Sequence, residues 1–194
     1  MAEQTVEAGT ESSKGLGRNE PLRLVGTVLL IALWVADLLV HHSTVHKVLG
    51  LVLIPVLVQV TISDLEERRI KNVVTVPAAF AALVIGLALH PSGLPGQLLA
   101  GVATLAFLTF FAIVSRGGLG MGDAKLGLVL GLFLSRYVIT ALVIGLVASA
   151  IFGLGVMAVR GFGAGRKTAI ALGPFLALGG VVALLAGPGL HLGT

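Results

Sequence analysis

Residues 97–126 read QLLAGVATLAFLTFFAIVSRGGLGMGDAKL, and this stretch decides the fold. Its first part, up to Val114, is apolar and uncharged over a length that can cross a bilayer as a helix. The chain then passes through Arg116 and several glycines to Asp123, where a second apolar segment begins. The stretch therefore predicts a membrane helix that is followed by a carboxylate at the start of the next helix.

The composition of the whole chain is that of an integral membrane protein. Of its 194 residues, 56% are hydrophobic and 11% are charged, and the mean hydropathy is +1.05, far from the soluble average. There is no cysteine, which excludes disulfides and thiolate metal sites. Residues 1–20 are polar and lack aromatic side chains, so we predict a disordered tail there and one transmembrane domain over residues 21–194.

The apolar pattern predicts an all-α, polytopic bundle of about seven spans, with six as the alternative. The fifth span is short and is separated from the sixth only by Ser-Arg-Tyr. The predicted spans cover residues 22–40, 48–64, 73–89, 97–114, 123–134, 138–159 and 168–187.

The basic residues orient this bundle. If the N-terminus is cytoplasmic, all of the 13 Lys and Arg residues except Lys47 and Arg136 fall on the cytoplasmic side, as the positive-inside rule requires. An even number of spans would break this agreement. The excess of basic residues is therefore a topology signal in a multi-pass protein of the cytoplasmic membrane, and it does not indicate nucleic-acid binding.

Two acidic residues stand at the same end of the predicted bundle. Asp64 ends the second span and Asp123 begins the fifth, whereas Asp37 lies toward the opposite end and is interpreted as structural. A carboxylate at membrane depth costs about 2.5–3.5 kcal/mol and indicates function by default. Two carboxylates that meet at a low-dielectric site share a proton, so one serves as an acid and the other as a base. Amide hydrolysis needs both roles, one to activate water and one to protonate the leaving amine.

The glycines before Asp123 fit this chemistry. Gly118, Gly120 and Gly122 permit close approach of a backbone, which would leave room for an extended peptide. The structural alternative is a flexible turn in which Asp123 is a helix N-cap and Asp64 is a solvated residue at a helix end. A Gly-x-Gly-Asp pattern does not decide between these interpretations without further residues.

Three blocks of the sequence supply these further residues. They are DLEERRIKN at residues 64–72, GLGMGDAKL at residues 118–126 and IALGPFLALGG at residues 170–180. Over about residues 50–180 this order resembles the type IV prepilin peptidases, which are membrane aspartic proteases with a Gly-x-Gly-Asp motif that presenilins share. The chain departs from the family pattern at Lys71, where proline is usual, and at residues 171–172, where Pro-Phe is common.

The resemblance implies that Asp64 and Asp123 are the catalytic acids of a peptidase domain, without metal or cofactor. The implied substrates are prepilin-like or pseudopilin-like precursors, whose leader would be cleaved at the cytoplasmic face. Larger relatives carry a cysteine-containing segment and also methylate the product, so we expect this chain to have the peptidase activity alone. The other matched positions are candidates for binding the substrate or shaping the site: Gly120, Gly122, Lys125, Arg69, Asn72, Gly173 and Pro174.

Several of these residues also have simpler interpretations. Lys125 should point away from Asp123 and either extend to the interface or guide substrate or phospholipid. Arg69 is expected at the interface, and Asn72 suits a helix N-cap. The His-His-x-x-x-His pattern at residues 41–46 lies at the other end of the bundle from the two acids, so a metallohydrolase is not supported.

Two other functions stay open at this point. An ion- or proton-coupled transporter would also place acids in the membrane, but it predicts a polar pathway that reaches the opposite face. An inactive relative that only binds pilin helices would keep the same motifs.

Overall fold

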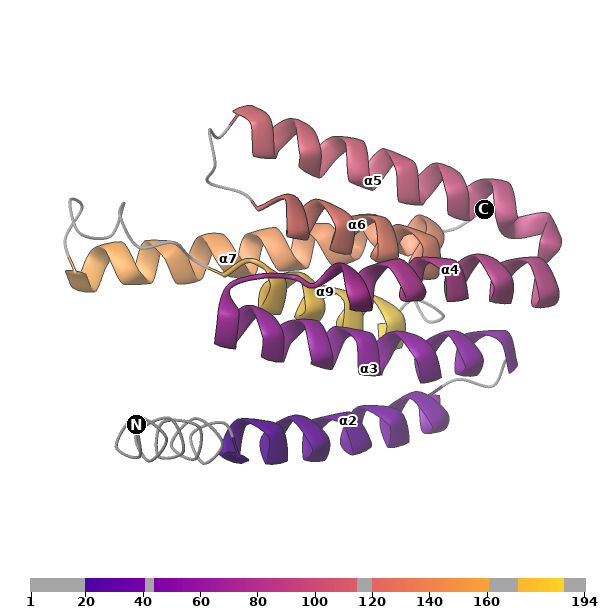
Figure 1. Ribbon diagram of the computed structural model, residues 1–194, viewed down its shortest axis with the longest axis horizontal. Helices are drawn as coiled ribbons and strands as arrows, with labels where there is room; N and C mark the ends of the chain where they lie inside the picture. Colours follow the sequence, from indigo (N-terminus) through magenta and orange to yellow (C-terminus); the bar gives the residue numbers. More distant parts are fainter. Residues whose placement is uncertain (1–19, 41–43, 115–119, 161–170, 187–194) are drawn as a thin grey trace, which may run out of the picture.

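The computed structural model describes residues 20–40, 44–114, 120–160 and 171–186, and the regular secondary structure in these ranges is helical throughout. This confirms the all-α prediction; the predicted tail, apart from Glu20, lies outside the described residues. The helices, shown in Figure 1, are α2 (Glu20–Val40), α3 (Thr44–Glu67), α4 (Asn72–Leu89), η1 (Pro91–Gly93), α5 (Leu94–Val114), α6 (Met121–Leu134), η2 (Ser135–Tyr137), α7 (Val138–Arg160) and α9 (Gly173–Ala186).

The length and composition of the helices support a multi-pass membrane protein, but they do not establish the predicted seven spans. Among the described residues, 4 helical stretches are long and apolar enough to cross a membrane, and α2 and α9 contribute shorter apolar helices. The long stretches are Lys47–Glu67, Asn72–Leu89, Pro91–Val114 and Met121–Val159. With 14 residues each, α6 and α9 extend only about 21 Å, less than the ~30 Å of the hydrocarbon core.

The boundary between the predicted fifth and sixth spans is a turn of the chain. Ser135 has φ 49°, in the left-handed region that non-glycine residues rarely adopt. It begins η2, and α6 and α7 run in opposite directions on either side of it (Figure 1). The long apolar stretch Met121–Val159 is therefore two antiparallel helices.

Glycines let α9 pack in the middle of the bundle. It lies between α3 and α7 (Figure 1). Gly179 contacts the backbone of Ala141 in α7, and Gly180 packs against Leu57 of α3 and Leu130 of α6. Small residues favour such close approach in membranes, where helix association depends on van der Waals packing. The core that results is formed mainly by α3, α6 and α9, with Leu53, Leu126 and Leu176 fully buried.

Gly127 and Gly131 of α6 face α5 of the same chain. Gly127 packs on Thr104 and Leu108, and Gly131 packs on the backbone of Ala100. These contacts fix α5 and α6 as an antiparallel pair and place the start of α6 beside the end of α5. The Gly-x-x-x-Gly spacing of α6 is therefore used inside the bundle, so it does not require a partner chain.

Candidate active site

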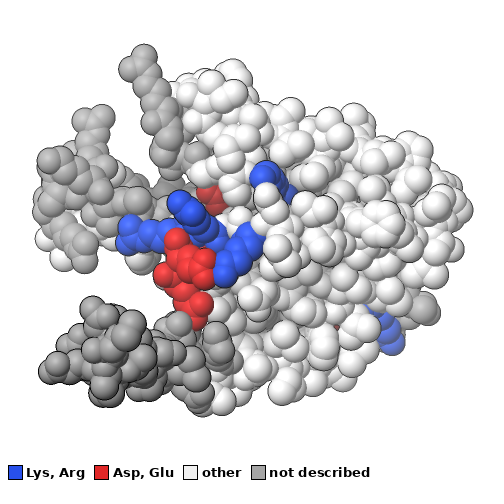
Figure 2. Space-filling model, in the orientation of Figure 1, with Lys and Arg blue, Asp and Glu red and all other residues white. Residues whose placement is uncertain are grey.

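One end of the bundle collects the charged side chains. The chain direction brings the end of α3 together with the starts of α4, α6 and α9 (Figure 1). Figure 2 shows acidic and basic side chains gathered at this end, on an otherwise largely uncharged surface. The described residues concerned are Asp64, Glu66, Glu67, Arg68, Arg69, Lys71, Asp123 and Lys125. The two aspartates therefore lie at the same end, as the charge-derived topology predicts.

Asp64 is held by the start of α9. The residue is only 6% exposed, and its Oδ2 accepts a hydrogen bond of 3.1 Å from the backbone N–H of Gly173. Gly173 is the first residue of α9, so its N–H has no partner within the helix and can bind a carboxylate. A Cβ at residue 173 would lie 2.6 Å from Oδ2 of Asp64. Only glycine allows this approach.

Asp123 is held by the start of its own helix. It is 8% exposed, and its Oδ2 accepts a hydrogen bond of 3.2 Å from the backbone N–H of Gly120. The N-cap of α6 is Gly120 and Asp123 is the third helical residue, so the interpretation of Asp123 as the N-cap was wrong by position. Its carboxylate instead reaches back to the N-cap N–H, as in a capping box. The helix dipole favours a negative charge at this position.

The two carboxylates interact with each other. The charge of Asp64 lies near enough to act on Asp123, although α4, η1 and α5 lie between the two residues along the chain. Each aspartate uses Oδ2 for its backbone hydrogen bond and makes no other side-chain hydrogen bond with a described residue. Two like charges in a poorly solvated site are stabilised when they share a proton. The arrangement can therefore supply an acid and a base side by side.

The segment between α3 and α4 crosses over the start of α6. Arg68, the residue after α3, has φ 51° and redirects the chain. Ile70 then packs on Gly122, where a Cβ would lie 2.9 Å from the Cβ of Ile70. Glycine at residue 122 therefore lets this segment lie directly on α6, one residue before Asp123. Ile70 was not singled out from the sequence, although it is the one apolar residue in the charged run EERRIKN.

Asn72 and Lys125 form a second contact between the motif at residues 64–72 and the motif at residues 118–126. Lys125 Nζ donates a hydrogen bond of 2.8 Å to Oδ1 of Asn72, across 53 positions of sequence. The N-cap of α4 is Lys71 and Asn72 is the first helical residue, so the assignment of Asn72 as an N-cap was wrong. Its side chain turns to Lys125 instead, which links the start of α4 to the start of α6.

Arg69 and Pro174, the other predicted site residues, lie at the same end of the bundle. Arg69 is exposed and makes no ion pair or hydrogen bond with a described residue. Pro174 is the second residue of α9, a position where its missing N–H costs no helical hydrogen bond. Within the described ranges, no three His, Cys, Asp or Glu side chains are grouped so that they could hold a metal ion. His41 and His42 lie outside these ranges.

Comparison with known families gives this geometry its context. Residues 51–157, more than half of the chain, match the model of the type IV leader peptidase family. The chain belongs to the type IV leader peptidase family. The matched residues of this leader peptidase include both Asp64 and Asp123. Neither the curated proteins nor the solved structures that were compared gave a match. Gly173 lies beyond the matched residues, yet it donates to Asp64.

Proposed function

We propose that this leader peptidase family member is an aspartic endopeptidase in which Asp64 and Asp123 are the catalytic acids. One observation carries the proposal. Two nearly buried carboxylates from different motifs lie at the same end of the bundle, and each accepts a hydrogen bond from a backbone N–H at the start of a helix. Orienting bonds of this kind position a catalytic group and leave its second oxygen for chemistry.

In the proposed reaction the pair holds one proton. The ionised carboxylate takes a proton from a water molecule as the water attacks the scissile carbonyl carbon, and the protonated carboxylate donates to the leaving amine. No covalent intermediate is formed and no metal takes part. The two aspartates titrate as a unit, so the roles belong to the pair rather than to either residue.

The proposed substrates are prepilin-like or pseudopilin-like precursors with a short basic leader ahead of an apolar helix. Family membership supports this class of substrate. Basic residues Arg68, Arg69, Lys71 and Lys125 lie at the aspartate end, and the positive-inside rule places such an end in the cytoplasm. We therefore propose that the site lies at the cytoplasmic face of the membrane and that this chain does not methylate the product.

The direct test is cleavage in cells. The full chain would be co-expressed with a panel of leader-bearing precursors, and leader removal would be followed by gel shift and N-terminal sequencing. The matched control is the Asp64→Asn/Asp123→Asn double variant at equal membrane levels. Cleavage by the parent alone is expected. Cleavage by both proteins would contradict the aspartate pair, and cleavage by neither, together with proton or cation flux in vesicles, would favour a transporter.

The Gly173→Ala variant is expected to lose at least about tenfold in cleavage rate. The added Cβ would lie 2.6 Å from Oδ2 of Asp64, so the carboxylate must move and lose its hydrogen bond from residue 173. A hydrogen bond to a charged group contributes about 1.5–3 kcal/mol. The measurement is the initial rate of leader removal in isolated membranes. Gly155→Ala is the matched control, because a Cβ there meets nothing within 4 Å; equal rates in the two variants would contradict this role of Gly173.

The Asn72→Ala and Lys125→Met variants are expected to reduce cleavage by about 3–10-fold each, the effect of one hydrogen bond of roughly 0.5–1.5 kcal/mol. If the 2.8 Å bond between the two side chains is their common role, the double variant should be no slower than either single variant. A double-mutant cycle of cleavage rates measures this coupling. Additive losses would instead mean that Lys125 acts on the substrate or on lipid independently of Asn72.

A further inference from the structure

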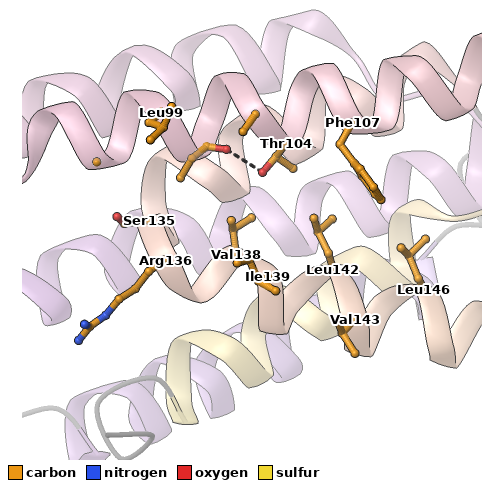
Figure 3. Close-up of a pocket in the computed structure, with 13 residues that line it drawn as sticks. Leu99, Thr104, Phe107, Ser135, Arg136, Val138, Ile139, Leu142, Val143 and Leu146 are labelled. Carbon is orange, nitrogen blue, oxygen red and sulfur yellow. Dashed lines mark hydrogen bonds between the residues drawn. The ribbon is translucent and has the colours of Figure 1, made fainter. Parts of the chain in front are cut away.

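An apolar groove with a volume of about 590 Å³ lies between α5 and α7, toward the end of the bundle opposite the aspartates. Figure 3 shows Phe107 of α5 directed toward Leu142 and Leu146 of α7, with Arg136 at one end. The hydroxyl of Thr104, which also lines the groove, donates to the carbonyl of Ala100 at 2.7 Å. A cavity of this size is in the range that binds small ligands, and its walls offer apolar contact.

The polar groups of the groove are concentrated at its mouth, in η2. Ser135 and Arg136 both line it, and Ser135 adopts the positive φ of 49° that turns the chain there. Strained residues of this kind tend to be retained where they serve a site. Arg136 is exposed, donates a hydrogen bond of 3.1 Å to the hydroxyl of Tyr137, and lies 5.1 Å from the centre of its ring. In Figure 3 the guanidinium extends away from the apolar side chains.

The positive charge of Arg136 has no protein counterion among the described residues. The ion pair that the described residues form, between Lys71 and Glu67, lies at the end of the bundle that holds the two aspartates. The one described carboxylate toward this end, that of Asp37, is 2% exposed and packs against Gly50 between α2 and α3. Arg136 is also one of two basic residues that depart from the positive-inside pattern. An anion from outside the chain would complement it.

The length of the groove indicates what occupies it. Its lining on η2 and α7 runs from Arg136 to Leu146, which is about 15 Å of chain in helical conformation. The hydrocarbon core of a bilayer is about 30 Å thick, so the groove extends through one leaflet from the interface inward. A transmembrane helix of a partner would need a contact face about twice as long. A lipid has the matching form, with a charged head at the mouth and a chain along the walls.

We propose that this groove binds an anionic glycerophospholipid, with an acyl chain between α5 and α7 and its phosphate at the Arg136 guanidinium and the Ser135 hydroxyl. Arginine suits this task because its planar fork of donors matches phosphate oxygens. Basic groups between transmembrane helices recognise lipid headgroups in the same way. The site is separate from the aspartate pair, so it does not rest on the proposed peptidase activity.

The test is selective retention of lipid by the full chain. Purified protein would be reconstituted in vesicles of equal parts phosphatidylglycerol and phosphatidylcholine, released gently, and examined by native mass spectrometry for each bound lipid. The parent should retain phosphatidylglycerol over phosphatidylcholine by roughly fivefold, which matches the ~1 kcal/mol per basic residue at an anionic surface. Arg136→Gln should abolish this preference. Lys47→Gln, which removes a charge toward the same end but outside the groove, should keep it.

A second variant tests the position of the acyl chain. Ala103 is exposed and lines the groove, so Ala103→Phe should fill it and remove the tightly bound lipid of both kinds. Retention of lipid by Ala103→Phe, or an equal preference in the parent and Arg136→Gln, would overturn the proposal. A dimer in the parent spectrum that Ala103→Phe disperses would also overturn it, because the groove would then hold a second copy of the chain.

Discussion

The Asp123→Asn variant is expected to lose leader cleavage by about 10²–10⁴-fold, the range that general acid–base catalysis contributes. Asparagine cannot ionise or share a proton with Asp64, so the pair loses one of its two roles. Its amide oxygen can still accept the hydrogen bond from the Gly120 N–H, which is 3.2 Å long in the parent. The loss should therefore appear in the rate of cleavage and not in the amount of folded protein.

Three variants make this test specific. Asp64→Asn should have a comparable effect, and the double variant should be little slower than either one, because residues that act as a unit are not additive. Glu67→Gln removes an exposed carboxylate that lies one turn from Asp64 and pairs with Lys71 at 2.6 Å, and it should cleave at the parental rate. The measurement is initial leader removal in membranes with matched protein levels. Residual cleavage within tenfold of the parent in Asp123→Asn would refute the acid–base role.

The helices and the common end of the two aspartates could be predicted because they depend on local patterns. Long uncharged runs form helices in lipid, since every backbone polar group must be satisfied within the segment. The alternation of basic and neutral connections then places the end of α3 and the start of α6 on one side. The number of spans is not fixed by the same reasoning. The apolar core of α2 and the whole of α9 are shorter than a membrane-length helix, so pattern alone does not say whether they cross.

The contacts within the site could not be predicted, because they join segments that are distant in sequence. The hydrogen bond from Gly173 to Asp64 spans 109 positions, and a glycine gives no chemical indication of the group that it approaches. Asn72 has the residue type of an N-cap, but its side chain binds Lys125 of α6 instead. A tertiary contact has overridden a local preference there. The motif resemblance indicated candidate site residues, and the structure shows how their side chains are held.

The Gly131→Ala variant is expected to lower the free energy of unfolding by about 1–3 kcal/mol, the usual cost of overpacking a tightly fitted position. A Cβ at this residue would lie 2.6 Å from both the carbonyl oxygen of Ala100 and the Cα of Gly101 in α5. Backbone atoms cannot rotate away as a side chain can, so α5 and α6 would have to separate. The midpoint of thermal unfolding in detergent micelles measures the effect.

Gly155→Ala adds the same methyl group to a helix where it meets nothing within 4 Å, and it should leave the midpoint unchanged or raise it slightly, since alanine is favoured over glycine in a helix by roughly 0.5–1 kcal/mol. Equal shifts in the two variants would mean that Gly131 does not set the distance between α5 and α6. Because Asp123 stands at the start of α6, displacement of that helix should also move the carboxylate away from Asp64. Gly131→Ala should therefore slow cleavage at temperatures where the protein is still folded, whereas Gly155→Ala should not.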